Sequence, residues 1–258
     1  MKSRVVLAIA AAILASFATL NAAEPKRPEP DHFEWALQTR MHNEGVLASA
    51  GGKVDLHSDQ HGSHTHQDLH LHLQGLDANA TYTLTAQVDT NSIEAVTFSP
   101  DLKGKADIHL HDKGPGHPHG HPGHIDDQLP AELQPVTMIS ALSVSDTNGT
   151  AILTADLTAP DKFEYHAKRD LSTDSIDARL DIHADTHKGE VRLHAKGLQA
   201  GASYSLAFEG NVVASATARD DGHLDLHAHL QNPADALSLG TVALLDADGN
   251  TVLSTTIP

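Results

Sequence analysis

Histidine dominates the chemistry that this chain can perform. The 258 residues include 21 His and no Cys, so imidazole is the best transition-metal ligand present, and thiolate sites and disulfides are excluded. Several histidines stand two residues apart, as in His70-Leu71-His72, His109-Leu110-His111 and His227-Ala228-His229. Because alternate residues of a strand point to the same face, each pair would present two imidazoles side by side. The spacing predicts sites for divalent transition metal ions.

Aspartate recurs beside these histidines at the same alternate spacing. A His-x-His pair with one His from the next strand supplies three nitrogen ligands, and Asp can complete the set or orient an imidazole. The candidate ligands on strands are Asp55, His57, His70, His72, Asp107, His109 and His111 in the first half, and Asp181, His183, His194, Asp225, His227 and His229 in the second. Arg192 stands where the first half has His70, so we expect the second half to bind metal more weakly.

Seven of the remaining candidate ligands lie in stretches that lengthen the first half: His61, His64, His66, His117, His119, His121 and His124. The last candidate, His187, lies in the second half. The Gly and Pro content from Gly114 to His124 is typical of a mobile loop, and we expect another around residues 60–66. Such loops would capture metal that the preorganised strand sites then retain.

Imidazole and carboxylate ligands without thiolate suit Zn²⁺, Cu²⁺ and Ni²⁺. We expect zinc first, with copper and nickel as alternatives, for buffering, sequestration or delivery. Two alternatives to a metal-binding role stay open: a merely solvated strand face, or a structural or adhesive protein whose imidazoles respond to pH. A three-His site that activates water is a third alternative. The hydrolase and phosphate-loop motifs are absent, so we expect no enzyme.

The elements that must position these residues repeat along the chain. Gly75 to Leu84 matches Gly197 to Leu206, and four other blocks recur in the same order. Strict alternation of apolar and polar residues predicts strands, and Asn148-Gly149 and Asp248-Gly249 predict hairpins with type I′ turns. We therefore expect an all-β chain of two tandem antiparallel β-sandwich domains (immunoglobulin-like), at residues 31–160 and 161–258. Residues 31–50 would be a strand or a loose lead-in.

The Gly75-Leu76 and Gly197-Leu198 turns and the strand layout are similar to those of the secreted chordin-type (CHRD) domain, a sandwich that resembles copper–zinc superoxide dismutase. This resemblance implies a secreted β-sandwich. The His-x-His pair that should follow the turn is replaced by Tyr82-Thr83-Leu84 and Tyr204-Ser205-Leu206. A dismutase site is therefore not expected.

The first residues have the layout of a secretory signal peptide. Lys2 and Arg4 precede an apolar run that is too short for a comfortable membrane span, so we expect a signal at 1–23 and a linker at 24–30. Loss of the signal leaves 15 basic against 34 acidic residues, a charge of −19. This excess argues against nucleic-acid binding. We expect a periplasmic or extracellular bacterial protein without a transmembrane segment, whose partners are metal ions and a metal transporter or envelope component.

Overall fold

The structure is a computed structural model that describes residues 31–113, 123–238 and 240–257. The predicted signal peptide and linker lie outside these residues. The described chain folds into seventeen β-strands and three short 3₁₀ helices, at Ala131–Leu133, Val136–Met138 and Pro233–Ser238. The predicted all-β class is therefore confirmed.

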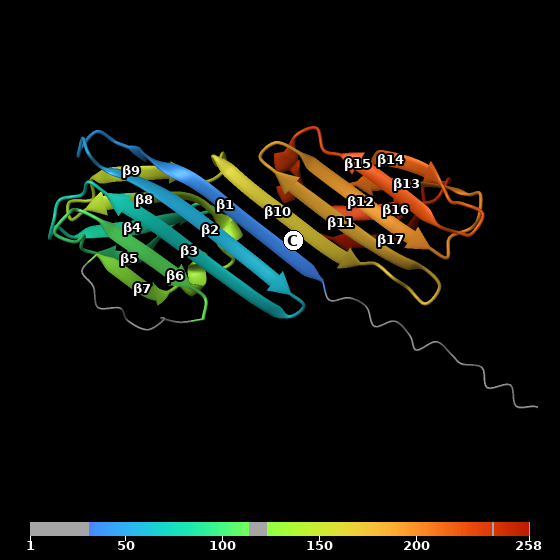
Figure 1. The fold of residues 1–258 in the computed structure, drawn as a ribbon, viewed down its shortest axis with the longest axis horizontal. Helices are drawn as coiled ribbons and strands as arrows, with labels where there is room; N and C mark the ends of the chain where they lie inside the picture. Colours follow the sequence, from blue (N-terminus) through green and yellow to red (C-terminus); the bar gives the residue numbers. More distant parts are fainter. Residues whose placement is uncertain (1–30, 114–122, 239, 258) are drawn as a thin grey trace, which may run out of the picture.

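Nine strands form one long sheet that runs through most of the molecule (Figure 1). Their order across the sheet is β15 (Leu224–His229), β12 (Gly189–Lys196), β11 (Asp177–Asp185), β10 (Lys162–Asp170), β1 (His32–Asn43), β2 (Gly51–His61), β3 (His64–Gln74), β6 (Ala106–His111) and β7 (His124–Gln128). All neighbours are antiparallel except β6 and β7, which are parallel. That pair departs from the antiparallel arrangement expected from the sequence, because β7 follows a connection rather than a hairpin.

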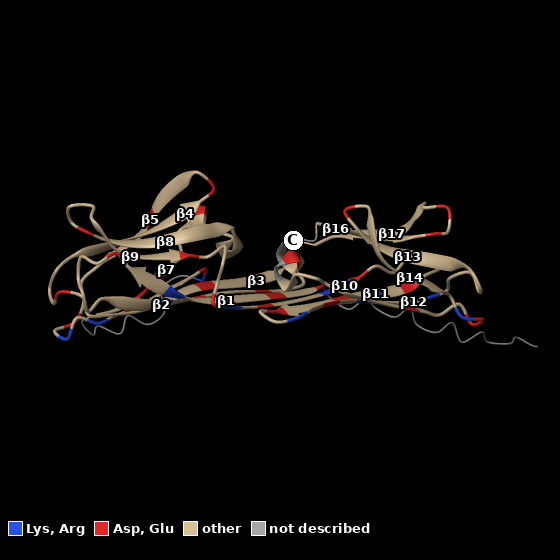
Figure 2. Ribbon diagram, turned by 90° about the horizontal axis from the view of Figure 1, so that it is seen from above, with Lys and Arg blue, Asp and Glu red and all other residues tan. Residues whose placement is uncertain are grey.

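Two four-stranded layers cover one face of the long sheet, one toward each end (Figure 2). The first layer contains β5 (Asn91–Phe98), β4 (Tyr82–Val88), β8 (Ile139–Asp146) and β9 (Ala151–Asp156), and the second contains β14 (Asn211–Thr217), β13 (Ser203–Phe208), β16 (Thr241–Leu245) and β17 (Thr251–Thr256). The end of β1 also pairs with β9, through His42 and Asn43, so β1 takes part in both layers of the first unit.

The core lies between the layers, and strand alternation explains its composition. On β3 the side chains of Leu69, Leu71 and Leu73 are at most 3% exposed, while the histidines between them lie on the opposite, outer face. Strands β2, β6, β11, β12 and β15 repeat this pattern. Burial of the aliphatic residues is the main favourable term, and it fixes which face the polar residues occupy.

The long sheet continues across the seam between the two repeats. The first strand of each unit, β1 and β10, pairs antiparallel with the other, with Trp35 opposite Tyr165. The Phe33 ring also lies edge-on to Tyr165, with centroids 5.4 Å apart. The repeats predict two tandem sandwiches, and the open edges of their two equivalent first strands join in antiparallel register, where Trp35 faces the equivalent residue Tyr165. Residues 31–50, the least defined part of the sequence, thus contain a central strand.

The two predicted hairpins form between β8 and β9 and between β16 and β17, but their turns are not type I′. Gly149 and Gly249 have positive φ (79° and 83°), whereas Asn148 and Asp248 do not. Asp146 accepts hydrogen bonds from the backbone of Asn148 and Thr150, which favours a longer turn with only glycine in the left-handed region.

Candidate metal centre

The outer face of the long sheet presents histidine and acid side chains in register across its strands. Between β3 and β6, His70 faces His109, and His72 faces Asp107. The same pattern recurs between β12 and β15, where Arg192 faces His227 and His194 faces Asp225. Three groups of two histidines and one carboxylate have ligand atoms within 4.8 Å of one another in the described residues.

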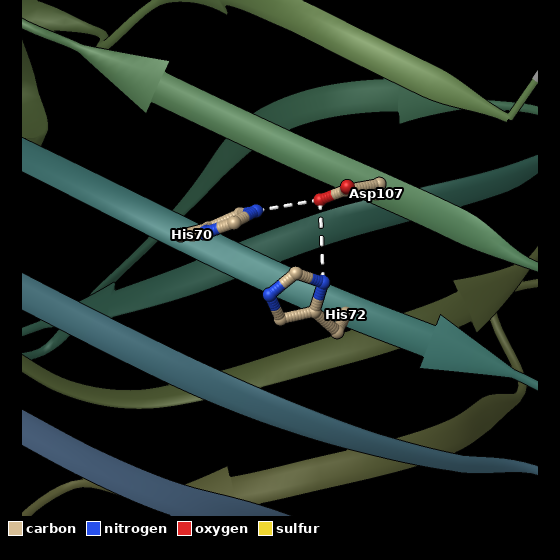
Figure 3. Close-up of side chains that lie close together, drawn as sticks. All are labelled: His70, His72 and Asp107. Atoms are coloured by element: carbon tan, nitrogen blue, oxygen red, sulfur yellow. Dashed lines mark hydrogen bonds and ion pairs between the residues drawn. The ribbon is translucent and has the colours of Figure 1, made fainter.

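The first group consists of His70 and His72 on β3 and Asp107 on β6 (Figure 3). The Nε2 atom of His70 lies 2.5 Å from Asp107 Oδ1, and Nδ1 of His72 lies 3.4 Å from the same oxygen. The two imidazole centroids are 4.1 Å apart. His72 and Asp107 also line a broad open concavity of about 1020 Å³.

The second group, His109 and His111 on β6 with Asp126 on β7, is the most enclosed. His111 Nε2 lies 2.8 Å from Asp126 Oδ1, and these two side chains are only 14% and 13% exposed. The parallel addition of β7 beside β6 brings Asp126 opposite His109. Low exposure reduces competition from water and strengthens the attraction between a carboxylate and a cation.

The third group, Glu190 on β12 with His227 and His229 on β15, lies in the second unit. His227 Nε2 is 3.7 Å from Glu190 Oε2, but Arg192 Nη2 is only 2.8 Å from that oxygen. Desolvation raises the pKa of Glu190, but the Arg192 hydrogen bond and charge outweigh it and leave the pKa below its ordinary value. The guanidinium therefore competes with any cation for this carboxylate.

Asp68 on β3 lies close to one histidine on each of three strands, β2, β3 and β6. It lies 3.4 Å from His57 Nδ1, 3.6 Å from His66 Nε2 and 3.6 Å from His109 Nε2. The hydrogen bond with Asp68 raises the pKa of His57. Burial acts to raise the pKa of Asp68, but the His57 hydrogen bond and the nearby imidazoles lower it more. Both shifts favour the charged form of the group concerned.

A donor set of two imidazoles and one carboxylate fits Zn²⁺ and Cu²⁺, which accept nitrogen and oxygen ligands together. The sequence led us to expect three nitrogens from a His-x-His pair and a neighbouring His. In each group the third ligand is instead a carboxylate from the adjacent strand. The first and third groups each include exposed histidines, so water can complete the coordination of an ion bound there.

Seven residues that were selected from the sequence take part in the three groups: His70, His72, Asp107, His109, His111, His227 and His229. The other described candidates lie outside the groups: Asp55, His57, His61, His64, His66, His124, Asp181, His183, His187, His194 and Asp225. His117, His119 and His121 lie outside the described residues. The assignment of all these residues as metal ligands stays a prediction.

Several candidates outside the groups already have polar partners. Asp55 accepts a hydrogen bond from Gln38 at 2.7 Å and contacts Lys53 at 2.9 Å. Asp181 contacts Arg179 at 3.4 Å. The His194 hydrogen bond, at 2.6 Å, is the largest cause of the lowered pKa of Asp225. His183 stacks edge-on against His166, and His187 lies exposed in the turn after β11.

Two stretches that were expected to be loops contain strand residues. His61 ends β2 and His64 begins β3, and the two face each other across a two-residue turn. Gly62, with φ of 60°, occupies the first central position of that turn, as in type II′ hairpins, so the strands extend to their tips. His124 begins β7 rather than ending a loop, and its Nδ1 atom lies 3.9 Å from Asp107.

Sequence reasoning missed the carboxylates Asp68, Asp126 and Glu190. Glu190 and Asp68 each stand two residues before a polar residue on the outer face, in Glu190-Val191-Arg192 and Asp68-Leu69-His70. That alternation was a usable signal. Asp126 had none, because β7 has only five residues and its Ile125-Asp126-Asp127 core does not alternate.

No protein-family model matches this sequence, and neither does any curated protein. Among solved structures, the chain is similar to one titled "Structural insight into host cell surface retention of a 1.5-MDa bacterial ice-binding adhesin". The identity is 12%, the match covers 87% of this chain and 85% of that chain, and the TM-score is 0.21. At these values the likeness does not extend to function. Within the described residues, no helix is long and apolar enough to cross a bilayer.

Proposed function

We propose that this protein is an exported, non-enzymatic protein that binds divalent transition metal ions on the outer face of its long sheet. The observation that carries the proposal is the recurrence of one donor set, two imidazoles and a carboxylate, at three places on a single solvent-facing surface. Zinc is the first expectation, with copper and nickel as alternatives, because the donors are borderline in softness and lack thiolate.

Binding is favoured over catalysis because His-x-His pairs at equivalent positions of both repeats, His109/His111 and His227/His229, each belong to such a group on the outer face. Repetition suits stoichiometric capture, in which capacity rises with the number of groups. We propose buffering, sequestration or delivery of metal in the periplasm or outside the cell, where the signal-like N-terminal sequence would direct the chain. A metal transporter or another envelope component would be the protein partner in delivery.

Zinc titration of the purified chain against a chromophoric chelator tests this proposal. The informative variant carries His70→Ala, His109→Ala and His227→Ala, which removes one imidazole from each group. The matched control carries His32→Ala, His42→Ala and His223→Ala, which removes as many histidines from outside the groups. We expect the first variant to bind zinc at least tenfold more weakly than the control. Equal affinities, or no wild-type binding below millimolar zinc, would contradict the proposal.

A pH-responsive surface is the second candidate, and the His57–Asp68 contact favours it. Many outer-face imidazoles contact a carboxylate, so protonation would turn a negative face into one of alternating charge as the pH falls. A conformational or adhesive response to acid in the presence of a chelator would favour this candidate. A response that requires bound metal would favour the first.

A further inference from the structure

Four imidazoles form an unbroken row across β3 and β6. Their order is His72, His70, His109 and His111, and consecutive ring centroids are 4.1, 5.3 and 5.1 Å apart. His70 and His109 are directly opposite each other in the strand register, so the row crosses from one strand to the next there. A carboxylate lies at each end of the row: Asp107 beside His70 and His72, and Asp126 beside His111.

We propose that the first two groups act together as one two-ion centre, an inference that rests on the proposed metal-binding function. One divalent transition ion would be held by His70, His72 and Asp107, and a second by His109, His111 and Asp126. The first group uses β3 and β6, and the second uses β6 and β7. From the spacing between strands and the rise along them, the two ions would lie roughly 5–9 Å apart.

The charges of the centre tolerate two ions at this separation. Each ion brings two positive charges and meets one carboxylate within its own group, which leaves a net charge of about one at each position. At roughly 7 Å, repulsion between two such charges weakens binding of the second ion roughly threefold if water screens it fully, and roughly fiftyfold at the effective dielectric constant of about 20 that suits a partly buried group. Asp68, 3.6 Å from His109 Nε2, lowers that repulsion further.

The second unit has the same register but lacks the paired arrangement. Arg192 occupies the place of His70, opposite His227, and interrupts the row of imidazoles. Glu190, which corresponds to Asp68, instead joins His227 and His229 in a single group. The second unit therefore serves as an internal control, because it would hold an isolated ion where the first unit would hold two adjacent ions.

Electron paramagnetic resonance of the full chain loaded with Cu²⁺ tests the two-ion centre. Two copper ions at this distance couple through their magnetic dipoles, which broadens the spectrum and produces a half-field transition. We expect both features in the wild type at three equivalents of copper. His70→Ala and His109→Ala should each abolish the coupling while the chain still binds copper. The control His227→Ala should lose up to one bound ion and keep the coupling.

The outcomes separate this inference from the proposed function. If the chain binds three copper ions but shows only the spectrum of isolated ions, the two-ion centre is wrong and the metal-binding function stands. Coupling that persists in both His70→Ala and His109→Ala places the pair elsewhere and also overturns the inference. If the wild type retains no copper after gel filtration, the proposed function itself fails. Circular dichroism of each variant verifies that these exposed substitutions leave the fold intact.

Discussion

Replacement of Arg192 by glutamine should strengthen metal binding in the second unit. Arg192 Nη2 lies 2.8 Å from Glu190 Oε2, the oxygen that would bind the ion held by His227 and His229. With a metal–oxygen bond of roughly 2.1 Å, the ion would lie within about 5 Å of that nitrogen and about 6 Å of the guanidinium centre. The substitution Arg192→Gln keeps a polar side chain and removes the charge.

Coulomb's law gives the size of the effect. Arg192 is 56% exposed, so the dielectric constant of water applies, and a single charge about 6 Å from a divalent ion then weakens binding roughly tenfold. At 0.15 M ionic strength the Debye length of about 8 Å reduces this to roughly threefold. Arg192→Gln should therefore raise zinc affinity roughly tenfold at low salt and threefold at physiological salt. The salt dependence identifies the cause as charge.

Site-resolved NMR of the His227 and His229 imidazoles measures this affinity while the other groups also bind zinc. Arg179→Gln is the matched control, because Arg179 is on the same face but faces His194, four residues along β12 from Glu190. That offset places it roughly 14 Å away, where screening leaves less than a twofold effect at 0.15 M salt. An unchanged affinity in Arg192→Gln, or an equal gain in Arg179→Gln, would refute the reasoning.

Three further predictions concern the same face and the core beneath it. Asp68→Asn should lower the pKa of His57 toward 6.5, because it removes the charged partner that raises this pKa; an NMR titration of His57 checks it, and an unchanged pKa would contradict it. The pair contributes its full stability between the unfolded pKa of Asp68, 3.8, and that of His57, 6.5, and this contribution is lost as the pH rises through the raised pKa of His57. Asp68→Asn should therefore cost more stability in urea at pH 5 than at pH 9. Leu71→Ala should lower the free energy of unfolding by about 2–5 kcal/mol, against less than about 0.5 kcal/mol for the neighbouring His70→Ala; similar losses would place His70 in the core. Bound zinc should be released between pH 7 and 5 as the imidazoles protonate, in equilibrium dialysis, and retention at pH 5 would argue for ligands other than histidine.

The sequence was sufficient to predict the strands and the outer face of the sheet, because both depend on local alternation. In Leu69-His70-Leu71-His72-Leu73 the leucines must be buried, so the histidines have only one face left. The same argument placed Asp107, His109 and His111 correctly on the outer side of β6. No information beyond a run of five or six residues is needed for such an inference.

The neighbours of each strand could not be predicted in this way, because pairing depends on contacts between residues far apart in the chain. Nothing in the local pattern indicates that β1 pairs with β10 or that β7 adds to β6 in parallel. The third ligand of each group comes from such a neighbour, as with Asp126 on β7. The sequence therefore indicated which side chains face outward, and the sheet order was needed to show which of them meet.

In this protein the packing of the core therefore also determines the geometry of the metal-binding groups. A slip of one residue between β3 and β6 would turn the outer histidines toward the core, so the buried contacts of Leu71 and Ile108 also hold His70 opposite His109. A cavity in the core beneath His70 and His109 would loosen the strand register without changing a metal-binding residue. Leu71→Ala should then weaken zinc binding at the first two groups while leaving the Glu190 group unchanged. An equal loss in both units would mean that global instability, and not local register, sets the affinity.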